Sequence, residues 1–297
     1  MPLTYTPRKR FSPQEYAQAI LAGDRIMLSR AITLIESKLP SDVALAEKVL
    51  EIILPHTGNS LRVGITGVPG VGKSTFIESF GKLITGMGKK LAVLTIDPSS
   101  QRSKGSILGD KTRMESLAND PMAYIRPSAS GATLGGVNNK TRETMLLCEA
   151  AGYEVILIET VGVGQSETTV AEIADFFLLL MLAGAGDELQ GIKKGIMEMA
   201  DALVITKADG DNVTMSQMAA REYANAMRLF PAQDSGWEPE VLTCSSVEQR
   251  GLDTVWDVIV RHHELMCQTG YFQAKRMEQN IAWMNEIIDY YLKYDFL

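Results

Sequence analysis

The chemistry of this chain begins at GVPGVGKST, residues 67–75, where glycines, a lysine and two hydroxyl side chains follow the order GxxxxGK[ST]. An apolar run precedes this stretch and a helical pattern follows it, and in that context the motif binds phosphates. Its glycines allow successive backbone N–H groups to point at phosphate oxygens. Lys73 is expected to reach the β- and γ-phosphates of a nucleotide, and the Ser74 hydroxyl to bind Mg²⁺. The residues predicted to bind the nucleotide here are Gly67, Gly70, Val71, Gly72, Lys73, Ser74 and Thr75.

Carboxylates in or beside neighbouring runs indicate a metal site next to this loop. The run YEVILIET ends near Glu159, and Gly162 follows three residues later, where a glycine N–H can approach a γ-phosphate without a clashing Cβ. Asp97 ends the run LAVLTID, and Asp110 lies in the polar loop GSILGDKTRM, which could order in a triphosphate state and relax after hydrolysis. Alone, such acids would be a helix cap or solvated charges. Beside the phosphate loop we predict that they approach Mg²⁺, directly or through water.

The stretch VITKADGD, residues 204–211, indicates which base is bound. In a K-x-D sequence at a strand end, the Asp carboxylate accepts hydrogen bonds from the N1–H and N2–H₂ groups of guanine, which adenine does not offer. Lys207 would pack over the base and Asp209 would read it. Thr206 stands where Asn is usual, and that Asn normally braces the loop. Ser245 and Ser246, in TCSS, would supply a backbone amide to guanine O6.

These motifs require a framework that brings strand ends together. Short apolar runs alternate with helical or loop segments, which predicts an α/β fold: a mostly parallel sheet with helices on both faces, as in P-loop NTPases. In such sheets ligands bind at the carboxyl ends of the strands. The expected strands are 61–66, 91–97, 122–127, 153–160, 176–182, 202–207 and 240–245.

Helical patterns flank this region. SPQE, residues 12–15, has the form of a capping box, and apolar residues recur at helical spacing through residue 54. We therefore expect an N-terminal helical subdomain over 1–60, a P-loop GTPase domain over 61–266 and a C-terminal helix over 267–297. The last helix carries an apolar seam that could dock on the same chain or on a second copy. The seam consists of Met277, Ile281, Met284, Ile288 and Tyr291.

Composition narrows the class of protein. With 297 residues, 45% hydrophobic and 22% charged, the chain is typical of globular proteins, and its net charge of −7 argues against nucleic-acid binding. Three scattered cysteines indicate reduced thiols in a reducing compartment. The N-terminus lacks the apolar core of a secretory signal, and no apolar run is long enough to cross a bilayer. We expect a soluble, cytoplasmic protein.

Over residues 10–290 the chain resembles the ArgK/MeaB family of P-loop GTPases, through GVPGVGKST, IDPSS, GSILGDKTRM, ETVGVGQSE, DELQGIKKGIMEMAD and KADGD. This family carries Glu, as at Glu159, where other GTPases have Asp. Its members are GTP-dependent chaperones of adenosylcobalamin-dependent acyl-CoA mutases, chiefly methylmalonyl-CoA mutase. They gate cofactor loading and protect the mutase from inactivation. The resemblance implies GTP and GDP as ligands and such a mutase as partner.

The resemblance also implies roles for single residues. The segment GAGDELQGIKKG, 184–195, would be a third switch whose Gln190 and Lys193 meet the nucleotide when the partner is bound, although its residues alone describe only a charged loop before a helix. The family ends in a dimerisation arm, which is shorter here, so a homodimer stays open. The Mg²⁺ ligands would be Ser74, Asp97, Asp110 and Glu159. The catalytic residues would be Lys73, Glu159, Gly162, Gln190 and Lys193.

Two alternative functions are a P-loop kinase and a metal-insertion GTPase. A P-loop kinase linked to amino-acid transport would need an acceptor pocket and a base, and K-x-D argues against ATP. A metal-insertion GTPase would need a Cys/His motif, but the histidines lie far from the cysteines in sequence. Ras-like GTPases orient water with a Gln directly after the switch glycine, where this chain has Val163. We therefore expect slow hydrolysis that a partner stimulates.

Overall fold

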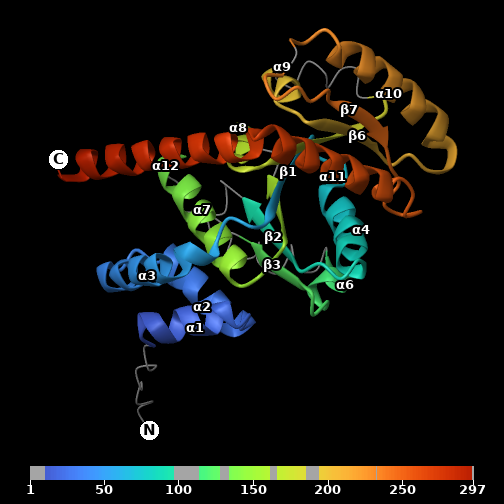
Figure 1. The fold of residues 1–297 in the computed structure, drawn as a ribbon. Coiled ribbons are helices and arrows are strands. Elements are labelled where there is room, and N and C mark those ends of the chain that lie inside the picture. The colour runs from blue at the N-terminus through green and yellow to red at the C-terminus, as the bar shows by residue number, and fades with distance from the viewer. Residues whose placement is uncertain are drawn as a thin grey trace. The chain divides into compact units, whose positions relative to one another are not determined.

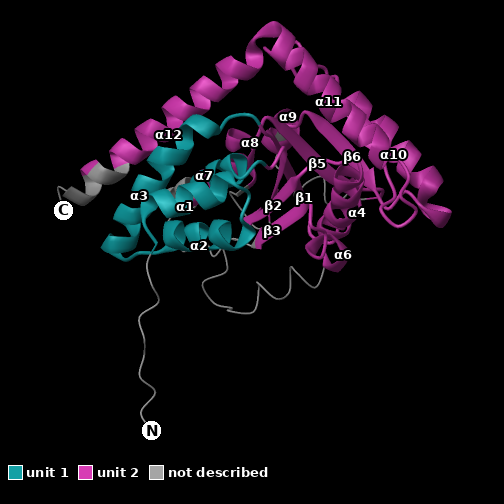
Figure 2. Cartoon of the chain, turned by 60° about the horizontal axis from the view of Figure 1, so that its bottom comes forward, with its two compact units in different colours: residues 1–59, 143–152 teal, residues 60–142, 153–297 magenta. Residues whose placement is uncertain are grey.

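The computed structural model describes residues 11–96, 114–127, 134–160, 166–184, 194–231 and 233–295. The chain divides into two compact units, coloured separately in Figure 2. Unit 1 contains residues 1–59 and 143–152, and unit 2 contains residues 60–142 and 153–297. The division passes through helix α7 (Leu134–Ala150).

Unit 1 is helical, as the sequence predicts for the N-terminal part. The expected capping box is present at its first helix, where the Glu15 amide donates to Ser12 Oγ over 3.1 Å and the Ser12 amide donates to Glu15 Oε2 over 2.7 Å. Asp24 caps the second helix by accepting from two backbone amides. These caps fix where each helix starts. The elements are α1 (Pro13–Leu21), α2 (Arg25–Glu36), α3 (Pro40–Ile53) and the 3₁₀ turn η1 (Leu54–His56).

Unit 2 is built on a seven-stranded sheet in the order β3-β2-β4-β1-β5-β6-β7 (Figure 1). All paired strands are parallel. Each of the predicted strands is present, which confirms the α/β expectation. The strands are β1 (Leu61–Gly67), β2 (Leu91–Ile96), β3 (Ala123–Pro127), β4 (Val155–Thr160), β5 (Phe176–Leu182), β6 (Ala202–Thr206) and β7 (Glu240–Thr243).

Helices pack on both faces of this sheet. On one face, Phe76 and Phe80 of α4 stack at 5.1 Å between ring centroids, and Trp256 of α11 packs against Phe80. On the other face, Gly64 of β1 lies against α8, because a Cβ there would lie 2.6 Å from Val170 Cγ1. The remaining elements of unit 2 are α4 (Lys73–Gly86), α6 (Glu115–Ala118), α8 (Ser166–Ile173), α9 (Lys194–Glu198), η4 (Gly210–Asn212), α10 (Val213–Met227), α11 (Leu252–Thr269) and α12 (Tyr271–Asp295).

Buried polar contacts hold the start of α12 on the amino ends of the strands. Arg276 donates through Nε and Nη2 to the Asp175 carboxylate, at 2.7 Å each, and through Nη2 to the Ser60 carbonyl at 2.6 Å. The seam residues Met277, Ile281, Met284 and Ile288 are exposed. The domain boundary expected after residue 266 falls within α11. No helix in the described ranges has the length and apolar character that crossing a membrane requires.

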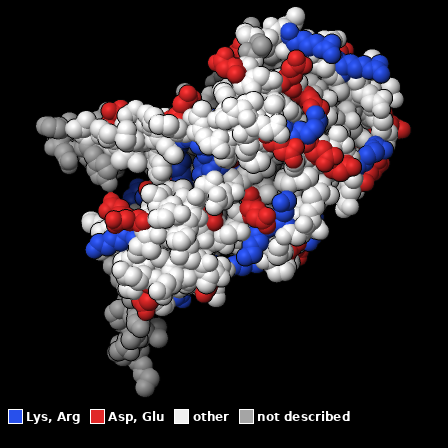
Figure 3. All heavy atoms as spheres, viewed as in Figure 1, with Lys and Arg blue, Asp and Glu red and all other residues white. Residues whose placement is uncertain are grey.

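Charge is mixed over the molecular face drawn in Figure 3. Lysine and arginine side chains are interspersed there with aspartate and glutamate, and large uncharged areas separate them. This distribution accords with an excess of only seven acidic over basic residues in the whole chain.

Candidate nucleotide-binding site

The phosphate loop joins the end of β1 to the start of α4, as the motif predicts. Gly67 lies so close to β5 that a Cβ would be 2.4 Å from the Leu180 carbonyl oxygen. Gly72, at the N-cap of α4, has a φ of 90°, a left-handed conformation that side chains with a Cβ rarely adopt. The loop therefore enters α4 in a turn that requires glycine. The first amides of a helix have no intrahelical acceptor and lie at its positive end, which suits them to bind phosphate oxygens.

Lys73 lies over this loop. Its ammonium donates to the Gly67 carbonyl over 2.7 Å and to the Val68 carbonyl over 3.4 Å. Burial lowers the pKa of Lys73, and the charges of Glu159 and Glu167 oppose that shift. An ammonium held by backbone carbonyls at the phosphate loop can exchange these acceptors for phosphate oxygens without leaving the loop.

Glu159 lies near the carboxyl end of β4, the strand beside β1. It is level with Ile65 of β1 and with Thr95 of β2, and its side chain is 4% exposed. The hydroxyls of Thr66 and Thr160 lie 2.9 Å apart and join the same two strand ends. The fold therefore brings the predicted carboxylate to the strand that leads into the phosphate loop.

The described residues hold only part of the predicted metal shell. Ser74 lies in the first turn of α4 and is half-buried. The Ser74 hydroxyl and the Glu159 carboxylate are the hard oxygen donors that Mg²⁺ prefers, so they fit this ion. Within the described part of the chain, no group of three or more His, Cys, Asp or Glu residues could hold a metal. Asp97, Asp110, Gly162, Gln190 and Lys193 lie outside the described residues.

The base motif follows β6 and is held in a defined conformation. Lys207 has a φ of 55° and its ammonium donates to the Gly70 carbonyl over 2.8 Å. The Ser245 hydroxyl donates to Asp209 Oδ2 over 2.6 Å, and the Ala208 amide donates to the Cys244 carbonyl. The lysine thus reaches the phosphate loop, while the aspartate is oriented from the segment that follows β7.

Thr206 joins the base motif to the phosphate loop. Its buried hydroxyl lies 2.7 Å from the Val71 carbonyl oxygen and 3.2 Å from that of Met181. From the sequence, Thr206 is a departure from the usual Asn. In the structure its hydroxyl binds the phosphate loop and so braces the base loop.

Further contacts at this site involve residues that the sequence analysis did not single out. Arg250 donates to the Ala208 carbonyl over 2.6 Å, and its backbone pairs with that of Ser245 in both directions. Asn212 donates to the Lys207 carbonyl over 2.7 Å, and Ser79 of α4 donates to the Ser246 carbonyl over 3.0 Å. No sequence motif marks these residues. The contacts of Arg250 and Ser79 arise only when separate elements meet, whereas that of Asn212 is local.

A phosphate loop after β1, a carboxylate on the adjacent β4 and a K-x-D loop after β6 define a P-loop NTPase with a guanine-reading motif. The family model described as Methylmalonyl Co-A mutase-associated GTPase MeaB matches residues 28–295. The chain belongs to this family, and it is a GTPase that binds GTP and GDP.

Individual relatives agree with this assignment. GTPase ArgK of Escherichia coli is 48% identical over 272 residues, covering 92% of this chain and 82% of the relative. The mouse Methylmalonic aciduria type A homolog, mitochondrial, is 46% identical over 290 residues, covering 94% of this chain and 70% of the relative. A crystal structure described as LAO/AO transport system kinase superposes with a TM-score of 0.82 at 40% identity, covering 97% of this chain and 86% of that one.

Proposed function

We propose that this GTPase is a chaperone of an adenosylcobalamin-dependent acyl-CoA mutase similar to methylmalonyl-CoA mutase, and that it gates cofactor loading and protects the mutase. The observation that carries this proposal is the family match over residues 28–295, whose description names association with methylmalonyl-CoA mutase. The similarity to the mouse Methylmalonic aciduria type A homolog supports it.

Within this function, each described site residue has a chemical task. The first amides of α4 and Lys73 bind the phosphates, while Asp209 and Lys207 select and cover guanine. Mg²⁺ would be held by Ser74, Asp97, Asp110 and Glu159. When bound, the ion neutralises charge on the β- and γ-phosphates. The buried position of Glu159 near the end of β4 supports its part in this set.

The switch role belongs to residues 184–195, which lead into α9. We propose that the mutase orders this segment and brings Gln190 and Lys193 to the nucleotide. Gly162 would contact the γ-phosphate through its amide. Since Val163 cannot orient water, hydrolysis without the partner is slow.

Oligomeric state and compartment are part of the proposal. The exposed seam of Met277, Ile281, Met284 and Ile288 on α12 would form a homodimer by packing against a second copy. The three cysteines lie far apart in the sequence, which supports a reducing compartment that we take to be the cytoplasm.

The two alternative functions receive less support. The word kinase appears in the description of one similar structure, but K-x-D favours guanine over the adenine of ATP. A metal-insertion role calls for a Cys/His motif, and within the described residues no such group could hold a metal.

Complex formation with a purified adenosylcobalamin-dependent mutase tests the proposal. Calorimetric titrations in GDP and in a non-hydrolysable GTP analogue should give saturable binding whose affinity depends on the nucleotide. An acyl-CoA-binding enzyme without cobalamin serves as control. Absence of binding in both nucleotide states would contradict the chaperone role while leaving the GTPase assignment intact.

A further inference from the structure

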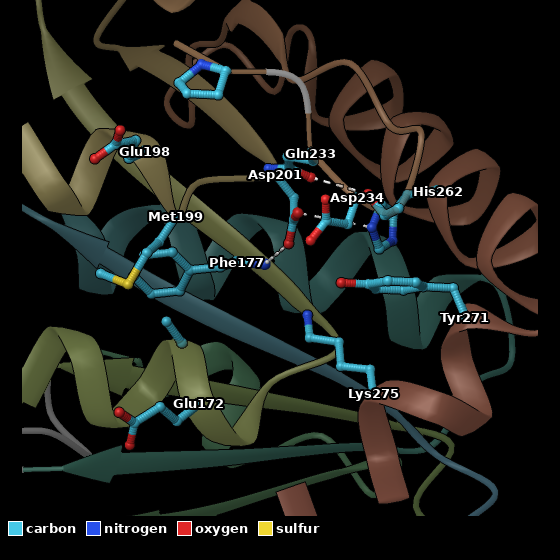
Figure 4. Close-up of a pocket in the computed structure, with 13 residues that line it drawn as sticks. Glu172, Phe177, Glu198, Met199, Asp201, Gln233, Asp234, His262, Tyr271 and Lys275 are labelled. Carbon is cyan, nitrogen blue, oxygen red and sulfur yellow. Dashed lines mark hydrogen bonds and ion pairs between the residues drawn. The ribbon is translucent and has the colours of Figure 1, made fainter. Parts of the chain in front are cut away.

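A cavity of about 570 Å³ lies at the amino-terminal ends of β5 and β6, whereas the nucleotide motifs lie at the carboxyl ends of the strands (Figure 4). Its walls come from the end of α8, the start of β5, the end of α9, the segment between α10 and β7, the middle of α11 and the start of α12. None of the residues assigned to GTP lines it. The cavity therefore needs an explanation of its own.

Acidic side chains dominate the lining. It contains four carboxylates, against Lys275 as the only lysine or arginine among its described lining residues. Lys275 already donates to the Asp175 carbonyl over 3.0 Å. Burial raises the pKa of Glu172 and of Asp201, so their charged forms are disfavoured unless a cation lies beside them. The lining therefore favours a cation over an anion. The carboxylates are those of Glu172, Glu198, Asp201 and Asp234.

The acids are arranged by depth. Glu198 and Asp234 are exposed at the rim, while Asp201 is only 6% exposed. Asp201 Oδ2 accepts from the Phe177 amide over 2.8 Å, and Asp201 Oδ1 lies 3.8 Å from His262 Nε2. Figure 4 shows the dashed link between Asp201 and His262 in the cavity wall. A buried carboxylate thus lies behind a rim of exposed ones.

His262 gives a second and independent indication of a ligand. The side chain is 3% exposed, lines the cavity, and within the described residues its Nδ1 has no hydrogen-bond partner. Burial lowers the pKa of His262 to about 3, so the ring is neutral and brings no positive charge to Asp201. A buried polar atom without a partner is costly, and a ligand or water that supplies donors relieves the cost.

Apolar side chains line the rest of the cavity. Met199 and Pro231 provide surface for a short aliphatic stem, and Tyr271 adds an aromatic ring with a hydroxyl. Phe177 also lines the wall but is only 1% exposed. A bare metal ion would not use this surface, and no group of three His, Cys, Asp or Glu residues in the described ranges could hold one. A ligand that matches both the acidic and the apolar parts of the lining has a cationic head with several N–H donors on an aliphatic stem.

We propose that this cavity binds an alkylguanidinium or alkylammonium group. The head would be bound by Asp201 together with the rim acids Glu198 and Asp234, and the stem would pack on Met199 and Pro231. Two sources share this chemistry: a free small amine, or an arginine or lysine side chain of another protein.

Calorimetry with agmatine and with the capped peptide acetyl-Gly-Arg-Gly-amide tests the proposal on the full chain in GDP. We expect saturable binding of at least one probe, weakened about tenfold or more in the Glu198→Gln/Asp234→Asn double variant. Tighter binding of agmatine indicates a free amine, and tighter binding of the peptide indicates a protein side chain.

The matched control is Glu238→Gln, which removes an exposed acid near Asp234 that does not line the cavity. It should bind the probes as the wild type does. The rim positions are exposed, so thermal unfolding should show all variants folded. The proposal is overturned if neither probe binds, or if the double variant and the control bind equally well.

Discussion

The hydroxyl of Thr206 lies 2.7 Å from the Val71 carbonyl and connects the end of β6 to the phosphate loop. The ammonium of Lys207, the next residue, reaches the Gly70 carbonyl of the same loop at 2.8 Å. The segment after β6 is therefore joined to the phosphate loop by two hydrogen bonds. We expect a substitution at Thr206 to weaken binding of the phosphates as well as binding of the base.

Thr206→Val keeps the shape of the side chain and removes its hydroxyl. The single O–H donor near the buried carbonyls of Val71 and Met181 is then lost, at a cost of about 1–3 kcal/mol. We expect GDP affinity, measured by calorimetry, to fall about tenfold or more. Thr206→Ser retains the hydroxyl and should bind nearly as the wild type does. Equal GDP affinity of Thr206→Val and the wild type would show that the contact between Thr206 and the phosphate loop does not contribute to nucleotide binding.

Base choice should depend on Asp209. Asp209→Asn presents an amide donor to the donor edge of guanine, so preference should shift from guanine to xanthine nucleotides. Ser245→Ala removes the hydroxyl that donates to Asp209 at 2.6 Å and should weaken GDP binding several-fold without changing base preference. Competition between GDP, XDP and ADP measures both effects. Comparable affinity of the wild type for ADP and GDP would be inconsistent with this account.

The Mg²⁺ concentration that GTP turnover requires should depend on Ser74 and Glu159. Ser74→Ala removes a hydroxyl oxygen, and Glu159→Gln replaces a charged carboxylate by a neutral amide. Both changes weaken the attraction for Mg²⁺, so turnover should require more Mg²⁺. GDP binding should suffer less, because the phosphate contacts of the loop remain. Titration of GTP turnover with Mg²⁺ is the measurement. An unchanged Mg²⁺ requirement in Glu159→Gln would remove this residue from the metal site.

Stability should fall in mild acid because of His262. Burial, with a smaller contribution from Lys275, lowers its folded pKa from the ordinary value of 6.5 to about 3. Between these values the unfolded chain binds more protons, so stability rises with pH and is lost as pH falls through this window. One such group contributes a slope of up to about 1.4 kcal/mol per pH unit.

Urea unfolding at pH 7 and pH 5 tests this effect. The loss of unfolding free energy between the two pH values should be smaller in His262→Gln than in the wild type, whatever the absolute stability of the variant. The control is His56→Gln, because His56 lies outside the cavity and is exposed. Identical losses in wild type and His262→Gln would contradict the assigned pKa.

Much of this architecture can be predicted from the sequence, for a physical reason. Strands buried on both faces are continuously apolar, so each apolar run indicates a strand, and the glycine spacing indicates the turn into α4. Glu159 and Asp209 lie in or just after such runs, and the carboxyl ends of parallel strands meet at one edge of a sheet. Local patterns therefore suffice to predict that both residues lie at that edge.

Other features are beyond local patterns. The hydroxyl of Thr206 binds the carbonyl of Val71, which lies 135 residues away in the chain. The sequence shows only that Thr206 replaces the usual Asn, and it does not show this contact with the phosphate loop. The contact of Arg250 with Ala208 likewise spans 42 residues. The acidic cavity gathers residues from several separate elements, between Ala171 and Lys275, and no short stretch of the sequence indicates it.

The central claim is that a mutase controls GTP hydrolysis by this chain, and steady-state turnover with and without a purified adenosylcobalamin-dependent mutase tests it most directly. We expect slow turnover alone and stimulation of more than about tenfold, below the roughly 10³–10⁵ of arginine-finger systems because residues 184–195 contain no arginine. The Gln190→Ala/Lys193→Ala double variant should bind GDP normally and lose the stimulation. Fast hydrolysis by the protein alone, or full stimulation of that double variant, would contradict the account.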